Sequence, residues 1–318
     1  MTASDPHTAQ DERSVSPDHA CDRREFLKAA GAVSLGMVAA NLAGAEPSAA
    51  EKKMPQIQMG KHSISRLVCG NNPFGGGSHL SIFVNHSMRS YYTPEQILKT
   101  LRRCEEAGIS AWQASSGHLD LYRRCLTEGG KMRFLAIEAN EPAVIERLAK
   151  GGCIGVAHHG ELTDQFFKQG QLDKVNECLK RLRDAGLLVG VSTHMPDVVD
   201  SIESKGWDLD YYMTCVYERH RSEADLHKLL GHVPIPVGEV YLKSDPPRMF
   251  KVMRQTKRPC LAFKILAAGR LCDHREWVER AFHETLTSIK PNDGVIVGIY
   301  DRYGDQAAEN AALVRRFG

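Results

Sequence analysis

Short apolar segments alternate with helix-forming segments along most of this 318-residue chain. Each of eight apolar segments has the length of a buried strand, and each precedes a segment with helical periodicity. Strict alternation of this kind is typical of a parallel sheet covered by helices. Eight repeats in fewer than about 280 residues favour a closed barrel over an open sheet. We therefore predict an α/β fold, a single-domain (β/α)8 TIM barrel, with strands at residues 66–69, 109–114, 134–138, 153–159, 188–192, 211–216, 260–265 and 294–299.

The first 45 residues have the pattern of an export signal. Residues 22–28 contain a twin-arginine pair, and a weakly apolar run and the small residues Ala43-Gly44-Ala45 follow. This resembles a bacterial twin-arginine (Tat) signal peptide, which the Tat translocase reads. We expect cleavage after about Ala45, a periplasmic or otherwise exported protein, a linker at 46–60 and the barrel at 61–318. The apolar run is short for a membrane span, so no stable membrane insertion is expected after processing.

Charge and cysteine content narrow the class of protein. The chain carries 41 Lys and Arg against 39 Asp and Glu, without a basic stripe, which argues against nucleic acid as a partner. Its nine cysteines include no C-x-x-C pair, and most fall within predicted strands and helices. We therefore expect most of them to be buried small hydrophobic residues rather than disulfide partners.

The predicted fourth strand ends in two histidines, His158 and His159. Side chains alternate along a strand, so Ile154, Val156 and His158 share one face. We take that face as the inside of the barrel, so that His158 points inward and His159 points the other way. The alternative is a histidine hydrogen-bonded within the core.

Other polar residues also follow predicted strands, at the end where barrels of this kind place their active sites. His118, Glu138, His158 and His194 come after four successive strands, so closing the barrel would bring them together. Two or three imidazoles with one carboxylate are a usual ligand set for Zn²⁺, Fe²⁺ or Mn²⁺. We therefore expect a divalent metal at His118, Glu138, His158 and His194, with a polar pocket free of metal as the alternative.

Several segments resemble the aldo-keto reductase family, and their order and spacing carry the resemblance. They are residues 63–76 for its first strand, 183–192 for its fifth, 263–271 for its seventh, and 295–298 with Glu309-Asn310 for its last strand and following helix. The similarity spans nearly all of residues 56–318. It implies a (β/α)8 barrel and NAD(P)H-dependent reduction of carbonyl compounds.

The resemblance also locates the family's Asp-Tyr-Lys-His tetrad, most of which is replaced. The matching residues here are Gln113, His118, Glu138 and His158, so only the histidine is kept. His118 would act as general acid in place of the tyrosine, with Glu138 orienting it. We predict His118, Glu138 and His158 as the catalytic residues.

The resemblance further implies contacts to NADP. Ser192 matches a position that contacts the carboxamide, and Lys264 would contact substrate or a cofactor phosphate. Arg302, Glu309 and Asn310 match the adenine and phosphate side of the family's cofactor site. The expected substrate is a small carbonyl- or hydroxyl-bearing molecule such as a sugar. Three functions stay open: a metal-assisted or acid–base enzyme, an NAD(P)-dependent oxidoreductase, and a non-catalytic exported binding barrel.

Overall fold

The structure is a computed structural model that describes residues 52–235 and 239–318. Residues 52–318 form one compact unit. The predicted signal peptide, residues 1–45, and the first six residues of the predicted linker lie outside the described residues. In the described part of the chain, no helix is both long enough and apolar enough to cross a membrane.

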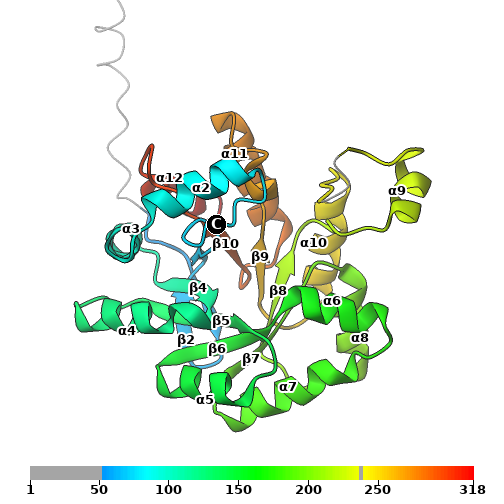
Figure 1. Cartoon of the computed structure of the whole chain (residues 1–318), viewed down its shortest axis with the longest axis horizontal. Helices are drawn as coiled ribbons and strands as arrows, with labels where there is room; N and C mark the ends of the chain where they lie inside the picture. Colours follow the sequence, from blue (N-terminus) through cyan, green and yellow to red (C-terminus); the bar gives the residue numbers. More distant parts are fainter. Residues whose placement is uncertain (1–51, 236–238) are drawn as a thin grey trace, which may run out of the picture. The chain divides into compact units, whose positions relative to one another are not determined.

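Eight parallel strands close into a barrel, which confirms the predicted (β/α)8 fold (Figure 1). Each strand pairs with its neighbours in parallel register, in the order β10-β3-β4-β5-β6-β7-β8-β9. The C-terminal ends of all eight strands therefore meet at one end of the barrel, which we call the mouth. The strands are β3 (Leu67–Gly70), β4 (Ala111–Ser115), β5 (Arg133–Glu138), β6 (Cys153–His158), β7 (Leu188–Thr193), β8 (Tyr211–Cys215), β9 (Cys260–Phe263) and β10 (Gly294–Gly298).

Helices follow every strand and surround the barrel (Figure 1). Eight of them lie in the segments with helical periodicity: α3 (Pro94–Glu106), α4 (Leu119–Thr127), α5 (Pro142–Lys150), α7 (Asp173–Asp184), α8 (Pro196–Lys205), α10 (Asp245–Gln255), α11 (Arg275–Ser288) and α12 (Gln306–Phe317). Capping residues help to fix where such helices begin. The Thr93 hydroxyl accepts from the Gln96 amide at the start of α3, and Pro94 takes the first helical position.

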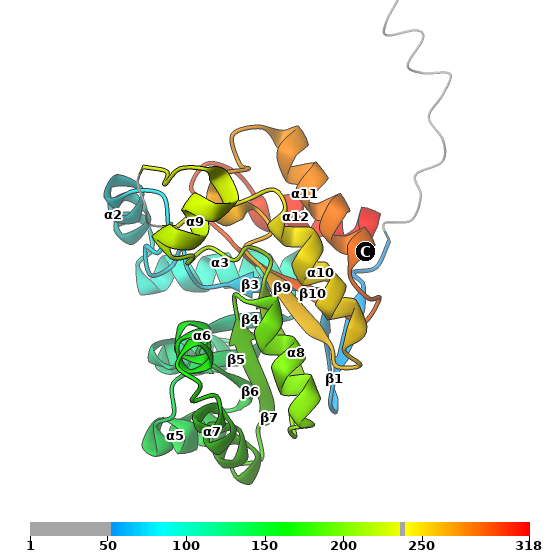
Figure 2. The same ribbon diagram turned by 90° about the vertical axis from the view of Figure 1, so that its right-hand side faces the viewer.

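Additional helices lie near the mouth of the barrel. They are α2 (Ile82–Tyr91), α6 (Gly160–Lys168) and α9 (Glu223–Leu230), and α2 and α6 were not predicted. Figure 2 shows all three at the end of the barrel opposite the β1–β2 hairpin. Helix α6 begins directly after β6, with His159 as its N-cap residue and no side-chain cap. A helix without a cap signal is hard to recognise from sequence.

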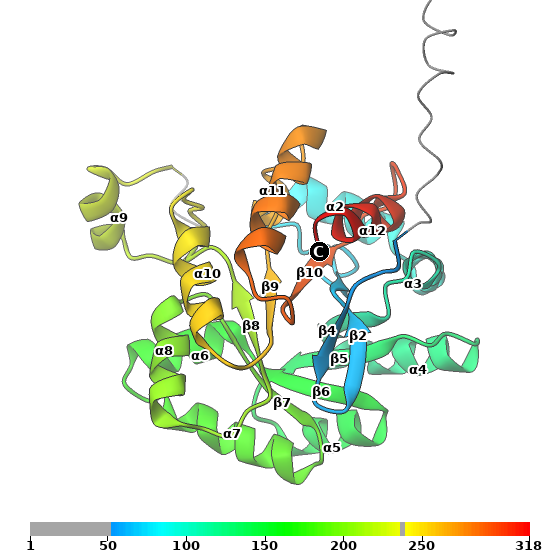
Figure 3. The same ribbon diagram turned by 180° about the vertical axis from the view of Figure 1, so that it is seen from behind.

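The last residues of the predicted linker, 56–60, form the first strand and the turn of a β-hairpin. Strand β1 (Gln56–Met59) pairs antiparallel with β2 (His62–Ser65) through a turn at Gly60. Figure 3 shows this hairpin across the end of the barrel opposite the mouth. Ile57, Met59 and Ile64 are buried against the inner residues of the strands. The hairpin therefore closes the floor of the barrel.

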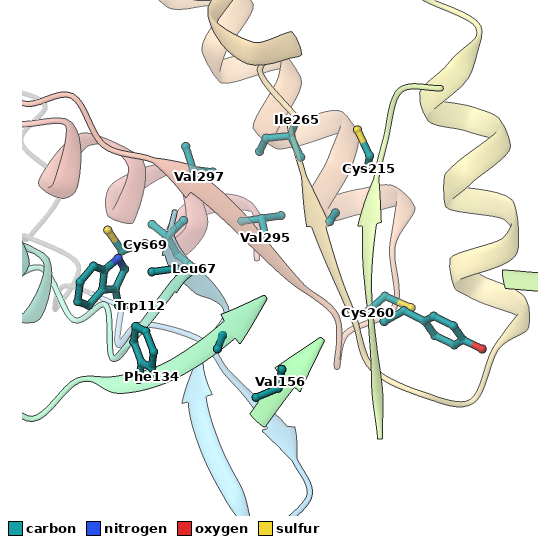
Figure 4. Close-up of a cluster of buried hydrophobic side chains, with 14 of the residues drawn as sticks. Leu67, Cys69, Trp112, Phe134, Val156, Cys215, Cys260, Ile265, Val295 and Val297 are labelled. Carbon is teal, nitrogen blue, oxygen red and sulfur yellow. The ribbon is translucent and has the colours of Figure 1, made fainter. Parts of the chain in front are cut away.

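Two apolar layers hold the barrel together. The outer layer packs strands against helices and includes Trp112 and Phe134, whose rings meet edge to face at 5.3 Å (Figure 4). The inner layer fills the barrel and includes Leu135 and Tyr211. Tyr211 fits because β7 has glycine at 190, where a Cβ would lie 2.4 Å from the tyrosine Cζ. All eight cysteines of the described part are free and seven are buried, as their placement predicted.

Candidate functional site at the barrel mouth

A lysine and a histidine from distant loops meet at the mouth. Lys264 follows β9 directly, and His79 lies in the loop after β3. The Lys264 amine donates a hydrogen bond of 2.8 Å to Nε2 of His79. Both residues have left-handed backbone conformations, with φ of 59° and 56°. Such conformations cost a non-glycine residue about 1–2 kcal/mol and are common at functional sites.

Glu239 is hydrogen-bonded to the other ring nitrogen of His79. Nδ1–H of His79 donates to Oε1 of Glu239 at 2.9 Å, and the Tyr241 hydroxyl donates to Oε2 at 2.8 Å. Because Nδ1 donates, Nε2 of His79 is left to accept from Lys264. Amine, imidazole and carboxylate are therefore joined in one hydrogen-bonded chain across the mouth.

Burial lowers the pKa of both His79 and Lys264 in this hydrogen-bonded arrangement. Burial, followed by the charges of Lys264 and Arg219, lowers the pKa of His79 to about 4. Burial also lowers the pKa of Lys264 to about 8, and the nearby Arg219 and Arg270 act in the same direction. At pH 7 about one Lys264 in ten would then be uncharged, against fewer than about one in a thousand for a free lysine. His79 is neutral at that pH.

A second histidine–carboxylate pair lies beside the first. Nδ1–H of His194 donates to Oδ2 of Asp164, a residue of α6, at 2.7 Å. Asp164 also accepts the backbone amide of His194 and the Thr193 hydroxyl. Burial lowers the pKa of His194, against the opposing effect of Asp164. The Asp164 carboxylate therefore fixes the ring orientation and the tautomer of His194.

Arg219 connects the two pairs. Its side chain is only 3% exposed, and it contacts Glu239, Glu161 at 2.6 Å and Nε2 of His194 at 3.3 Å. A cavity of about 350 Å³ opens between α6 and the loops after β7 and β8, and Glu161 and His194 are among its lining residues. A buried guanidinium between two carboxylates is a fixed positive charge within this mouth.

The prediction that His158 points into the barrel is wrong. His158 is 1% exposed, and its Nδ1 lies 2.7 Å from the hydroxyl of Thr163 on α6. Val156, on the same face of β6, packs in the outer layer between strands and helices. His158 therefore points toward the helices, and Ala157 points inward. Burial, followed by the charge of His159, lowers the pKa of His158 to about 4.

Glu138 and His118 also lie apart from the Lys264–His79 pair. Glu138 is next to His158 in the register of β5 and β6, and Ala136, on the same face of β5, packs in the outer layer. One Glu138 oxygen accepts the amide of Ala139. His118 ends a short 3-10 turn, with Nδ1 3.3 Å from the Ser115 hydroxyl and its ring edge-on to Trp112. Burial lowers the pKa of His118.

The structure does not gather the four predicted metal ligands, His118, Glu138, His158 and His194, into one group. Over residues 52–235 and 239–318, no three or more His, Cys, Asp or Glu side chains are arranged to hold a metal ion. Strand alternation explains the separation, because Glu138 and His158 face the helices whereas His194 faces the mouth. Metal binding stays a prediction from the sequence.

The five predicted NADP contacts differ in accessibility. Arg302 and Glu309 are exposed, and Lys264 is half-buried. Ser192 and Asn310 are buried, with exposed fractions of 0% and 6%. A dinucleotide bound to the exposed surface would therefore reach only part of this set.

Sequence reasoning missed most of the mouth. His79, Glu239 and Arg219 lie in loops whose conformation no local pattern predicts. Asp164 and Glu161 lie on the unpredicted helix α6. One usable signal was present, because Glu161, Asp164, Gln165 and Lys168 repeat with helical spacing after the two histidines.

The sequence and the structure were compared with those of known proteins. No family model matches the sequence, and no curated protein matches it significantly. Among solved structures, the chain is similar to a glycerol dehydrogenase from Gluconobacter oxydans, with 13% identity, a TM-score of 0.50, and coverage of 83% of this chain and 90% of that one. A truncated 3-deoxy-D-arabino-heptulosonate 7-phosphate synthase from Thermotoga maritima has 12% identity and a TM-score of 0.48, over 83% of this chain and 91% of that one. The closed parallel barrel and the first of these similarities show a (β/α)8 barrel fold.

Proposed function

We propose that this chain is a barrel enzyme that acts on a small carbonyl- or hydroxyl-bearing compound by proton transfer at the mouth. The observation that carries the proposal is the chain of two hydrogen bonds that joins Lys264, His79 and Glu239. A neutral imidazole held between an amine and a carboxylate can accept a proton and return it. Its place at the C-terminal end of the strands is the usual place for catalysis in this fold.

The second pair, His194 with Asp164, supplies another acid–base group at the same mouth. Arg219 contacts both pairs, through Glu239 and through His194. Its buried positive charge would favour the negative charge that develops on a carbonyl oxygen when a neighbouring C–H loses its proton. The site would then exchange or move a proton next to a carbonyl group.

Deuterium exchange tests the proposal. The mature protein would be incubated in D₂O with glyceraldehyde, dihydroxyacetone, hydroxyacetone and pyruvate, and NMR would follow the C–H next to each carbonyl. We expect wild type to accelerate exchange of at least one compound and His79→Ala to lose most of the acceleration. The matched control is His232→Ala, which removes an exposed histidine. No acceleration with any compound would contradict the proposal.

Nicotinamide-dependent reduction with His118 as general acid is a second candidate. Arg302 favours it, because this exposed guanidinium lies over the rings of Tyr91 and Tyr303 at 5.9 and 5.5 Å. A cation between aromatic rings suits the adenine and phosphate end of NADP. Fluorescence titration with NADPH separates the candidates: binding that weakens in Arg302→Ala supports reduction, and no binding at millimolar NADPH ends it.

Metal assistance is tested by metal analysis of the purified mature protein. A stoichiometric divalent ion, lost in His158→Ala and in His194→Ala, would support the ligand set predicted from sequence. A substoichiometric metal content, with no gain of exchange activity on adding Zn²⁺, Mn²⁺ or Fe²⁺, would count against it. If the wild type and His118→Ala bind the same carbonyl compound with equal affinity and neither turns it over, the protein is a non-catalytic binding barrel.

A further inference from the structure

The Lys264 amine has the surroundings of a nucleophile rather than of an ion pair. In the described part of the chain, no ion pair involves Lys264, and its hydrogen-bond partner is the neutral His79 ring. The residue is half-buried at the mouth. An amine becomes nucleophilic when it is desolvated or lies beside other cations. Lys264 meets both conditions.

The charged groups facing Lys264 come from several elements. Burial, with Arg219 and Arg270 acting in the same direction, lowers the pKa of Lys264 to about 8, and Glu161 and the Cys215 thiol oppose this shift. Arg219 is already paired with Glu161 and Glu239. A substantial fraction of the amine is therefore uncharged at neutral pH, whereas an exposed lysine is almost entirely charged.

Arg270 offers a site for an anion near the same amine. Its guanidinium donates to the backbone carbonyls of Ala267 and His79, and it lies 4.2 Å from the Tyr241 ring centroid. Within residues 52–235 and 239–318, no carboxylate forms an ion pair with it. A guanidinium without a carboxylate partner, held over an aromatic ring, is suited to a carboxylate or phosphate of a ligand.

We propose that Lys264 forms a Schiff base with a small aldehyde or ketone that carries an anionic group, and that Arg270 binds that group. This inference deepens the proposed function, because a protonated C=N bond withdraws electrons and acidifies the neighbouring C–H far more than a carbonyl does.

The covalent step balances with one proton taken up from solvent. The neutral amine adds to the carbonyl carbon, and a C–N bond forms as the C=O π bond breaks. One amine proton passes to Nε2 of His79, the acceptor that Lys264 already contacts, and His79 returns it to the alkoxide oxygen, which gives the carbinolamine. The hydroxyl group then takes a second proton, supplied by solvent through His79, and leaves as water while the nitrogen lone pair forms C=N; the nitrogen keeps its other hydrogen, so the C=N bond is protonated. Hydrolysis by the reverse path restores the lysine.

Reductive trapping tests the inference on the mature protein. Wild type would be incubated with pyruvate and with the uncharged hydroxyacetone, each with sodium cyanoborohydride, and digested for mass mapping. Lys264 should gain the mass of the carbonyl compound less one oxygen atom, at least about tenfold faster than exposed lysines such as Lys243. Pyruvate should label Lys264 faster than hydroxyacetone does, and Arg270→Met should remove that preference.

The variants keep the outcomes distinct. Lys264→Met should abolish the adduct, and the matched Lys243→Met should retain it. Mapping on wild type needs no variant, so a Lys264→Met protein that fails to fold leaves the test intact. Equal labelling of Lys264 and exposed lysines would overturn the inference. Deuterium exchange without a Lys264 adduct overturns the Schiff-base inference but leaves the proposed function standing. A Lys264 adduct without deuterium exchange supports the Schiff base but contradicts the proposed function.

Discussion

The Lys264 amine donates to Nε2 of His79 over 2.8 Å, although 185 residues separate the two in the chain. Both residues adopt left-handed backbone conformations at the ends of their loops. Because Lys264 takes this conformation directly after β9, strand alternation does not set the direction of its side chain. The pair therefore depends on how two loops fold over the mouth.

His79 provides the first prediction. His79→Ala removes the acceptor of the Lys264 amine, and we expect deuterium exchange to fall about 10²-fold or more, the usual loss on removing a general base. Glu239→Gln keeps the size of the side chain but removes the negative charge beside Nδ1, so its loss should be smaller. Exchange rates and the urea unfolding midpoint should be measured on the same samples. A rate unchanged in His79→Ala would remove His79 from the chemistry.

His158 predicts a pH-dependent stability. Its pKa is about 4 in the folded state and about 6.5 when unfolded, so the folded state binds fewer protons between these values. The stabilisation of the folded state by the neutral His158 ring is therefore complete above pH 6.5. It is lost as the pH falls toward 4, and the total loss in free energy of unfolding is on the order of 3 kcal/mol. The free energy of unfolding in urea should fall less steeply with acid in His158→Gln. His86→Gln, at an exposed histidine, should keep the wild-type slope.

Gly190 tests the packing of the inner layer. A Cβ at this position would lie 2.4 Å from Cζ of the fully buried Tyr211. Gly190→Ala should therefore cost about 1–3 kcal/mol in free energy of unfolding, because a packed barrel cannot easily move an inner ring. Gly75→Ala is the control, since a Cβ there has no neighbour within 4 Å. The cost should shrink when Tyr211→Leu is already present, and additive costs would argue against a direct clash.

The twin arginines test export. Arg23 and Arg24 lie in the pattern that resembles a Tat signal. Replacing both by lysine should keep the precursor inside bacteria that have the Tat pathway, because this address is read by a receptor. Cell fractionation measures the distribution, and N-terminal sequencing of the exported form should start near residue 46. Export of the double variant at the wild-type level would contradict the expectation.

Strand and helix positions were predictable because their signals are local. The apolar run at residues 153–159 predicts the fourth strand, and the observed strand β6 covers Cys153–His158. The end of a parallel strand also locates the mouth by topology alone, which is why Lys264 and His194 were already candidates. These inferences need only the period of side chains along an element.

What the tertiary structure decided is which side chains meet. Sequence pattern could not tell the inner face of β6 from the outer one, since both faces are apolar in a buried strand, and His158 was assigned to the wrong face. It also could not place His79 opposite Lys264, because loop closure and left-handed residues depend on packing across the whole barrel. The chain's own pattern therefore determined a (β/α)8 barrel with its polar groups at one end, and only the closed fold determined that an amine, an imidazole and a carboxylate form the candidate site.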